Sequence, residues 1–250
     1  MNDPNDRPHS PAPRPPRSAW QADTDLPPFA PLARDARVDV AIVGAGIAGL
    51  TTAYLLAIAG KKVAVLDDGP IGDGMTARTT AHLASAIDDR FVTLERLHGE
   101  RKSRLAAASH AAAIDCIERI VAERHIDCAF ERVDGYLFQA PGEQPLDLDY
   151  HYVRVSPLPD GQELVIVGGE DHKTGQADDT AVRHARLEAW ARERLPTMGP
   201  VLHRWAGQVL ETIDGLALLG RNPHDHDNVF VATGDSGMGM THGTIAGLLI

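Results

Sequence analysis

Hydrophobic and polar positions change their pattern three times between residues 38 and 68. The segment "VDVAIVG" (38–44) is a short apolar run rich in β-branched residues, which predicts a buried strand. The next segment, "IAGLTTAYLLAIAG" (47–60), predicts a helix that Gly60 ends. The third segment, "KKVAVLDD" (61–68), predicts a second strand. Together they predict a β-α-β unit, which implies parallel strands and a right-handed crossover.

Helical spacing follows from about Asp89 to His125. Apolar residues there recur three, four or seven positions apart with charged residues between them, namely Leu94, Leu97, Leu105, Ile114, Ile117 and Val121. The segment "DCAFERVDGYLFQA" (127–140) then predicts a strand with a bend at Gly135.

The second half of the chain mixes strand and helix patterns. Residues 150–169 hold two alternating runs around "PLPDGQ", which predicts a hairpin. The segment 180–195 predicts an amphipathic helix closed by Pro196. "NVFVATG" (228–234) predicts a short buried strand, and a last helix begins near Thr241. The fold class is therefore α/β.

Most of the prolines fall within residues 1–34, which predicts a disordered, extended tail. Trp20 and Phe29 are candidates to anchor its second half onto the folded part. Beyond the tail we expect residues 35–149 to hold the β-α-β unit and the helical block. Residues 150–200 would hold the hairpin and a helix, and residues 201–250 would return to the first part.

Charge and composition narrow the class of protein. The net charge of -11 argues against a nucleic-acid partner. No apolar run approaches the roughly 20 residues that span a bilayer, and no secretory signal is evident, so we expect a cytoplasmic protein. Cys116 and Cys128 lack partners at metal-ligand spacing, so we expect reduced cysteines and no metal.

The segment "GAGIAG" (44–49) follows a predicted strand and opens a predicted helix, as a dinucleotide-binding turn does. Gly44 would permit the tight turn, Gly46 the approach of backbone to a pyrophosphate, and Gly49 close packing of helix on strand. Ala45, Ile47 and Ala48 would contribute main-chain N–H groups beside them. Asp67, 18 residues after Gly49 and followed by Asp68, would bind the adenosine ribose.

A second glycine-rich segment, "TGDSGMGMTHGTIAG" (233–247), decides which dinucleotide is expected. NAD needs one such crevice, whereas FAD is extended and its flavin end often needs a second main-chain cradle. A helix N-terminus beside the flavin would stabilise negative charge on the reduced ring. The residues expected there are Gly234, Asp235, Gly237, Met238, Gly239, Met240 and Thr241.

Several segments have residues that could indicate a chemistry different from dinucleotide binding. His82 and Ser236, in "TTAH" and "GDSG", imitate the flanks of a serine-protease triad, but the β-α-β opening is the wrong scaffold. "NPHDHDN" (222–228) is read as a solvated turn rather than a metal site. His172, on a loop after a predicted strand, is a candidate for a substrate-side role.

Five segments carry a family resemblance: "DVAIVGAGIAGLTTAYLLA", "VLDDGPIG", "ARTTAHL", "RWAGQVLETIDGLALLGRNP" and "VFVATGDSGMGMTHGTIAG". The chain resembles the D-amino-acid oxidase/glycine oxidase (DAO) family of FAD-dependent oxidoreductases, in the bacterial branch often fused to a C-terminal Rieske domain. The likeness runs through two blocks, 36–149 and 150–250. It implies a Rossmann-like FAD-binding domain with a partial antiparallel-sheet substrate domain.

The resemblance also implies a site and a reaction. Thr79 and Thr80 would lie along the pyrophosphate and flavin, and residues 237–241 against the isoalloxazine. The family oxidises C–N bonds of amines or amino acids by hydride transfer to flavin N5 and passes electrons to an acceptor such as oxygen, a quinone or an iron–sulfur protein.

Three departures from the family pattern stand out. The chain lacks a middle segment after residue 149, and it stops inside an apolar helix without Rieske ligand motifs. Val209 stands where amino-acid-oxidising relatives place a carboxylate-binding arginine, and Arg204 and Arg221 are candidate substitutes. The alternatives to an amine oxidoreductase are a degenerate FAD- or nucleotide-binding module without turnover, and an NAD(P)-linked Rossmann dehydrogenase.

Overall fold

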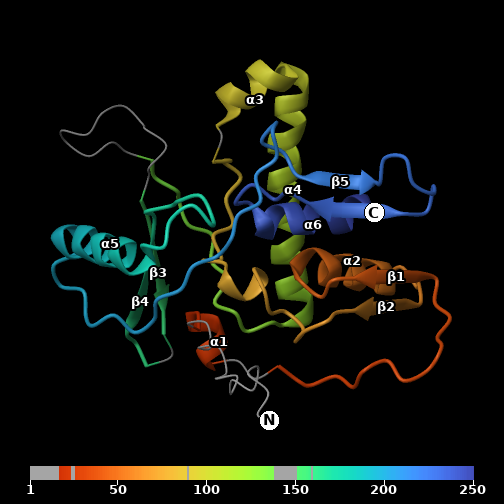
Figure 1. Cartoon of the computed structure of the whole chain (residues 1–250), viewed down its shortest axis with the longest axis horizontal. Helices are drawn as coiled ribbons and strands as arrows, with labels where there is room; N and C mark the ends of the chain where they lie inside the picture. Colours follow the sequence, from red (N-terminus) through yellow and green to blue (C-terminus); the bar gives the residue numbers. More distant parts are fainter. Residues whose placement is uncertain (1–16, 24–25, 89, 138–150, 159) are drawn as a thin grey trace, which may run out of the picture.

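The computed structural model describes residues 17–23, 26–88, 90–137, 151–158 and 160–250 (Figure 1). The hairpin β3–β4 and helix α5 form one group at the left of Figure 1, while β1, β2, α2, β5 and α6 gather at the right beside the long helix α4. The elements in chain order are α1 (Ala19–Asp23), β1 (Val40–Val43), α2 (Ile47–Ile58), β2 (Val63–Leu66), the short 3₁₀ turn η1 (Thr76–Arg78), α3 (Phe91–His98), α4 (Glu100–Arg124), β3 (Tyr152–Pro157), β4 (Glu163–Gly168), α5 (Thr180–Arg194), β5 (Leu218–Arg221), β6 (Phe230–Thr233) and α6 (Gly239–Leu249).

The β-α-β unit predicted at the start of the folded part is confirmed. Strands β1 and β2 pair in parallel, with Val40 opposite Val63. Gly60 has a φ of +81°, and its N–H donates to the carbonyl of Ala57. Only glycine adopts that φ readily, so Gly60 ends the helix as predicted.

The predicted helical block is two helices, because the chain breaks at Gly99, whose φ is +81°. Leu94 and Ile114 are buried, as their spacing suggests, but Leu97 and Leu105 are exposed. The starting residue of the block, 89, lies outside the described residues.

The strand predicted over 127–140 is wrong for residues 127–137, which form neither helix nor strand. Ala129 has a φ of +50°, which interrupts extended backbone. Tyr136 and Leu137 are exposed, and no strand of the described residues pairs with this segment. Residues 138–140 lie outside the described part.

The expected tail needs a correction at its second half. Residues 1–16 lie outside the described part, but residues 19–23 form α1. Trp20 anchors this helix, because its indole N–H donates to the carbonyl of Thr79 at 2.6 Å. Phe29 does not serve as an anchor, since it is 69% exposed.

The hairpin and the helix after it are confirmed, although residues 150 and 159 lie outside the described part. Strands β3 and β4 are antiparallel, with Tyr152 opposite Gly168, and α5 spans nearly the predicted range. Strand β6 is confirmed, but it pairs antiparallel with β5, which the sequence pattern did not predict. Phe230 at its start is exposed, so the expected burial of this strand is wrong.

Helix α6 packs directly on α2, and the two run in the same direction. A Cβ on Gly243 would lie 2.9 Å from the Cγ2 of Ile47, and a Cβ on Gly247 would lie 3.0 Å from the Cγ2 of Thr51. An advance of four residues on one helix therefore matches an advance of four on the other. The two glycines allow this approach because they lack side chains. Helix α4 packs on the other side of α6.

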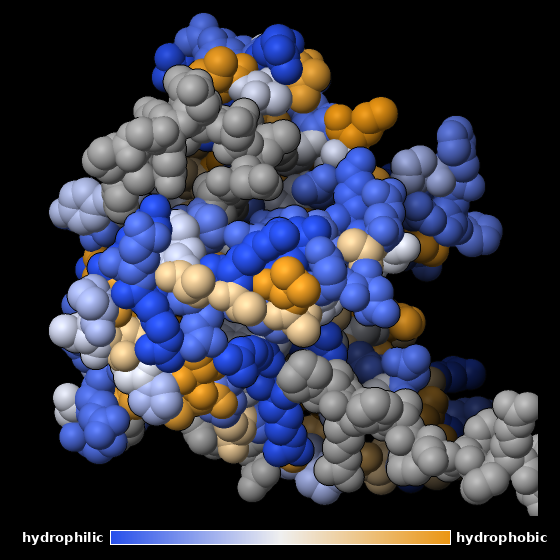
Figure 2. Space-filling model, turned by 60° about the vertical axis from the view of Figure 1, so that its left-hand side comes forward, coloured by the Kyte–Doolittle hydropathy of each residue, from blue (hydrophilic) through white to orange (hydrophobic). Residues whose placement is uncertain are grey.

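Much apolar surface is left uncovered. The strands of the described part form three separate two-stranded sheets, and Val43 in β1 is 88% exposed. The burial predicted for β1 is therefore wrong at its C-terminal end. On the face shown in Figure 2, apolar groups interrupt the polar surface.

Candidate functional site

The first glycine turn has the geometry that close packing of a helix on a strand requires. Gly44 has a φ of +102°. A Cβ on Gly49 would lie only 1.9 Å from the carbonyl oxygen of Gly44, so no side chain fits there. Glycine at both positions lets α2 begin immediately after β1 and present its N-terminus at the end of the sheet.

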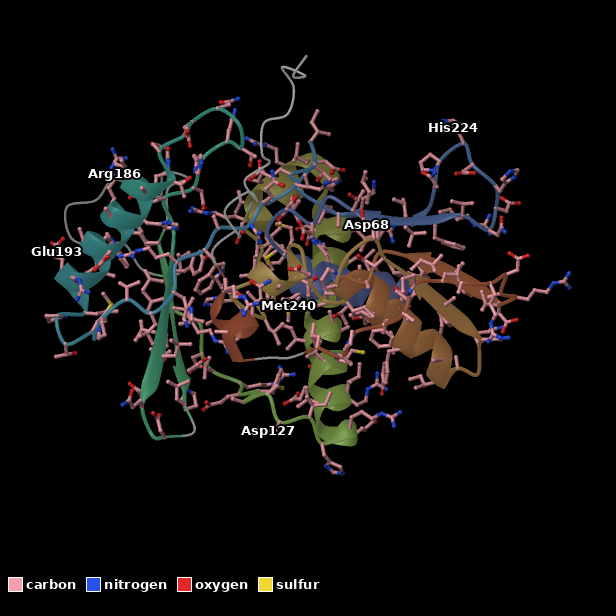
Figure 3. The ribbon with its side chains drawn as sticks, turned by 60° about the horizontal axis from the view of Figure 1, so that its bottom comes forward. Asp68, Asp127, Arg186, Glu193, His224 and Met240 are labelled. Carbon is pink, nitrogen blue, oxygen red and sulfur yellow. The ribbon has the colours of Figure 1, made fainter. Side chains whose placement is uncertain are left out.

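Asp67 holds this turn in place. One of its carboxylate oxygens accepts the N–H of Ala45 at 2.6 Å, and the other accepts the N–H of Gly69 at 2.8 Å. These hydrogen bonds, first the one from Ala45, lower the pKa of the Asp67 carboxyl. Each oxygen keeps a lone pair that can accept a ribose hydroxyl. Asp68 follows at the end of β2 and is exposed (Figure 3).

Thr76, which the sequence analysis missed, occupies the N-terminus of α2. Its hydroxyl oxygen accepts the N–H of Ile47 at 2.9 Å and would lie 3.1 Å from a Cβ on Gly46. An oxygen acceptor thus already binds the first helical N–H, where the helix dipole favours an anion. Thr76 is too distant in sequence from the helix for any local capping pattern to reveal it.

Hydrogen bonds from three parts of the chain fix the segment that follows η1. The N–H of Ala81 donates to the Thr79 hydroxyl at 3.1 Å. One guanidinium nitrogen of Arg154, on β3, donates to the carbonyls of Thr80 and Ala81, both at 2.9 Å. The indole of Trp205 donates to the carbonyl of Arg78, which precedes Thr79. Thr79 and Thr80 are therefore fixed between α1, the hairpin and the loop before β5.

The second glycine turn also needs residues without side chains. Gly234 and Gly237 have φ values of +68° and +79°. A Cβ on Gly237 would lie 2.6 Å from a carboxylate oxygen of Asp88, so this turn touches the end of the 79–88 segment. Ser236 is buried, and its hydroxyl accepts the N–H of Thr212 at 3.4 Å.

A serine-protease arrangement finds no support in these contacts. The imidazole Nδ1 of His82 bonds with the Thr80 hydroxyl at 3.0 Å, and its ring meets Tyr152 edge-on at 5.2 Å. Neither His82 nor Ser236 has the other as a hydrogen-bond partner within the described residues.

A buried polar cluster lies beneath the start of α6. Nδ1 of His110, on α4, bonds with the Thr241 hydroxyl at 2.9 Å, and Nδ1–H of His242 donates to the carbonyl of Asp235 at 2.8 Å. Burial, and then the neighbouring His242, lower the pKa of His110 to about 4. Burial also lowers the pKa of His242 and raises the pKa of the Asp235 carboxyl. Both imidazoles are therefore neutral near pH 7.

The parallel packing of α2 and α6 brings the two glycine turns to the same end of the helix pair. Gly243 lies against the first residues of α2, so α6 begins one turn beyond them. Both N-termini, with their partial positive charges, therefore open to the same side. Gly239 and Met240 lead into α6, and Figure 3 places Met240 in the middle of the molecule.

The family model for FAD dependent oxidoreductases (DAO) matches residues 39–154 and 134–250, which together cover most of the chain. This chain belongs to the DAO family. Family membership implies an FAD-binding, Rossmann-like α/β fold, and the two overlapping matches accord with a chain shortened in its middle. The residue-149 junction itself lies outside the described part.

Curated relatives of this DAO chain match parts of it. The provisionally named Rieske 2Fe-2S iron-sulfur protein YhfW of Bacillus subtilis (strain 168) is 33% identical over 164 residues, which is 61% of this chain and 32% of the relative. The protein named probable oxidoreductase OrdL of Haemophilus influenzae and the gamma-glutamylputrescine oxidoreductase of Escherichia coli (strain K12) are each 29% identical over 119 residues. These matches cover 48% of this chain and 27% and 28% of the relatives.

The chain thus spans about a third or less of the curated relatives it matches. No solved structure matches it. Among the described residues, no helix combines the length and apolar character that crossing a membrane requires.

Among the described residues, the contacts found for the three catalytic candidates are with acidic side chains and not with the glycine turns of the DAO site. Arg204 forms an ion pair with Glu188 of α5 at 2.7 Å, and Arg221 forms one with Asp227 at 3.1 Å on the exposed β5–β6 loop. Figure 3 shows His224 at the tip of that loop. His172 is exposed in the loop after β4.

Proposed function

We propose that this DAO-family chain binds FAD and oxidises C–N bonds of small amines or amino acids. The observation that carries the proposal is the parallel pair α2–α6, which places two glycine turns and two helix N-termini at one end. An NAD(P)-linked dehydrogenase needs only the first of these turns. The second turn therefore favours a cofactor with two separate groups for the protein to bind, a diphosphate at the first turn and a flavin ring at the second.

The residues present fit the cofactor. Gly46 leaves room for the diphosphate beside the N-terminus of α2, and Gly44 and Gly49 allow the turn and the close packing that place this N-terminus. The Asp67 carboxylate retains acceptor capacity for a ribose. The Thr76 hydroxyl accepts the first N–H of α2. We therefore expect this hydroxyl either to hydrogen-bond the diphosphate or to move away, so that the diphosphate accepts the N–H instead. At the other end, the first residues of α6, Gly239 to Thr241, offer main-chain N–H groups, whereas the N–H of Met238 donates to the carbonyl of Asp235.

Bound FAD would supply the two-electron acceptor for hydride removal from the carbon next to nitrogen. The chain's own contribution is to hold and orient. The N-terminus of α6 would stabilise negative charge beside it. Arg154 and Trp205 keep residues 78–81 in one conformation against the site.

The substrate and the electron acceptor are proposed from relatives. One relative is named gamma-glutamylputrescine oxidoreductase, which supports an amine substrate. Another is named a Rieske iron–sulfur protein, which supports an iron–sulfur acceptor alongside oxygen or a quinone.

A flavin-binding module without turnover is the second candidate. It is favoured by Val209 in place of an arginine and by the ion pairs that occupy Arg204 and Arg221. Anaerobic addition of amines separates the two candidates: bleaching of the flavin absorbance supports an oxidoreductase, and bound flavin that no amine reduces supports the module.

The cofactor assignment is tested with Gly46→Val. The purified wild-type chain is expected to be yellow, and the variant is expected to lose its flavin because a side chain at position 46 collides with Thr76 and blocks the diphosphate. Gly135→Val is the matched control, since a Cβ there meets nothing within 4 Å. Equal flavin content in wild type and Gly46→Val, measured by absorbance after denaturation, would contradict the assignment.

A further inference from the structure

Strand β3 delivers a cluster of polar side chains to the 79–82 segment. Arg154 donates to the carbonyls of Thr80 and Ala81. The Tyr152 hydroxyl hydrogen-bonds the Thr80 side chain, and the Tyr152 ring packs edge-on against His82. The cluster therefore lies directly beside residues that we expect along the flavin.

The fold keeps the aromatic member of this cluster in place. Gly168 lies opposite Tyr152 in the hairpin, and a Cβ on Gly168 would come within 1.9 Å of the Tyr152 ring. Glycine at this position of β4 thus makes room for the ring. Burial raises the pKa of Tyr152, which keeps its hydroxyl protonated and able to donate.

Arg154 has no acidic partner among the described residues, in contrast to several other arginines of the chain. Arg132, Arg183 and Arg204 all form ion pairs. Arg154 instead uses one terminal nitrogen for two carbonyls and lies over the Trp20 ring at 5.7 Å. Burial lowers its pKa, and no carboxylate of the described residues counteracts that effect.

The guanidinium is therefore oriented but not neutralised. The two carbonyls fix Nη1, so Nε and Nη2 remain as a planar pair of donors. A carboxylate is the group that such a pair binds with two parallel hydrogen bonds. A half-buried cation gains most from an anion that arrives with the ligand.

We propose that Arg154, assisted by Tyr152 and His82, binds the carboxylate of the substrate, so that the preferred substrate is an amino acid or another amine that carries a carboxylate. This inference rests on the proposed function and assigns to β3 the role that Val209, Arg204 and Arg221 do not fill. Arg154 selects the substrate and positions it, and it takes no part in proton or hydride transfer.

The test uses benzoate and benzamide, two ligands of nearly the same shape of which only the first is charged. Each is titrated into the purified full-length chain and followed by tryptophan fluorescence, because Trp20 lies beside Arg154. Benzoate is expected to bind about tenfold or more tightly than benzamide in the wild type. Arg154→Met is expected to abolish this preference for benzoate. Arg154→Lys keeps the positive charge but lacks the planar pair of N–H donors, so it is expected to retain a weaker preference.

Arg204→Met is the matched control and should leave the preference for benzoate unchanged. Equal affinities for the two ligands in the wild type would overturn the proposal, and so would loss of the preference in Arg204→Met rather than in Arg154→Met. Circular dichroism of each variant shows whether it is folded.

A second measurement needs no variant. Burial, and then the charge of Arg154, lower the pKa of His82. Benzoate bound at Arg154 would offset that charge and is therefore expected to raise the pKa of His82, observed by NMR titration. An unchanged His82 pKa at saturating benzoate would contradict the inference. Flavin content is measured separately: a wild type without flavin would defeat the proposed function, while the titrations of the flavin-free chain would still decide the role of Arg154.

Discussion

Gly49 shows how closely helix α2 approaches the turn that precedes it. The space that a Cβ would fill is already taken by the carbonyl oxygen of Gly44 and a methyl group of Ile42. A backbone oxygen cannot move aside as a flexible side chain can. The glycine is thus required by packing, whether or not a cofactor is bound.

Gly49→Ala is accordingly expected to lower the free energy of unfolding by about 1–3 kcal/mol, the usual cost of overpacking. Urea denaturation of the flavin-free chain measures it. Gly135→Ala, where the added methyl meets nothing within 4 Å, should change stability far less. A Gly49→Ala chain as stable as the wild type would show that α2 can shift away from β1.

Single residues were predictable where the signal was local. The spacing of Gly44, Gly46 and Gly49 sufficed because all three roles arise within one turn. Thr76 and Arg154 gave no such signal, since each acts on backbone far away in the sequence. Arg204 and Arg221 were proposed from their nearness in sequence to Val209, and the structure pairs both with acids instead.

Among the elements, those with a strong repeat of apolar positions were predicted well: α2, α5 and the hairpin β3–β4. The errors have physical causes. Residues 127–137 have strand-like composition, but the positive φ of Ala129 interrupts extended backbone, and no strand within the described ranges pairs with them. Strand β5 is short and contains Gly220, so its sequence pattern did not predict a strand. Its pairing with β6 is seen only in the structure.

The contact between α4 and α6 makes a pH-dependent contribution to stability. The unfolded chain binds a proton at His110 near its ordinary pKa of 6.5, whereas the folded chain does so only near pH 4. Stability from this group is therefore complete above pH 6.5 and decreases as the pH falls toward 4. The expected loss is about 2 kcal/mol at pH 5 and about 3 kcal/mol at pH 4.

Urea denaturation at pH 7.5 and pH 5 measures this loss. His110→Gln should be less stable at pH 7.5 but should show a shallower pH dependence than the wild type. His125→Gln, which removes an exposed histidine at the end of the same helix, should keep the full dependence. Identical pH profiles for wild type and His110→Gln would contradict the assignment.

At the scale of the whole molecule, the sequence predicted β1, β2, β3, β4 and β6 as strands but not how much of them is covered. An apolar strand is buried only if neighbours flank its sheet, and no pattern within the strand reports them. Strand β1 has only β2 as its partner in the described part, so Val43 faces solvent. Exposed strand edges of this kind pair readily with other chains.

The chain is therefore expected to self-associate as its concentration rises. Val43→Lys places a charge on the exposed end of β1 and should shift the onset of association, followed by light scattering, to about tenfold higher concentration. Val133→Lys is the control, because Val133 is 76% exposed but lies outside any strand. Equal onset in both variants would show that the β1 edge is not the contact.

The pairing of α2 with α6 also constrains when the protein matures. The two helices that open the site are separated by residues 59–238, which are 180 residues of chain. Bringing such distant segments together is slow and costs loop-closure entropy. A nascent polypeptide holds the first glycine turn long before α6 has emerged from the ribosome. On the proposed function, we therefore expect the flavin to be loaded only after α6 has docked on α2.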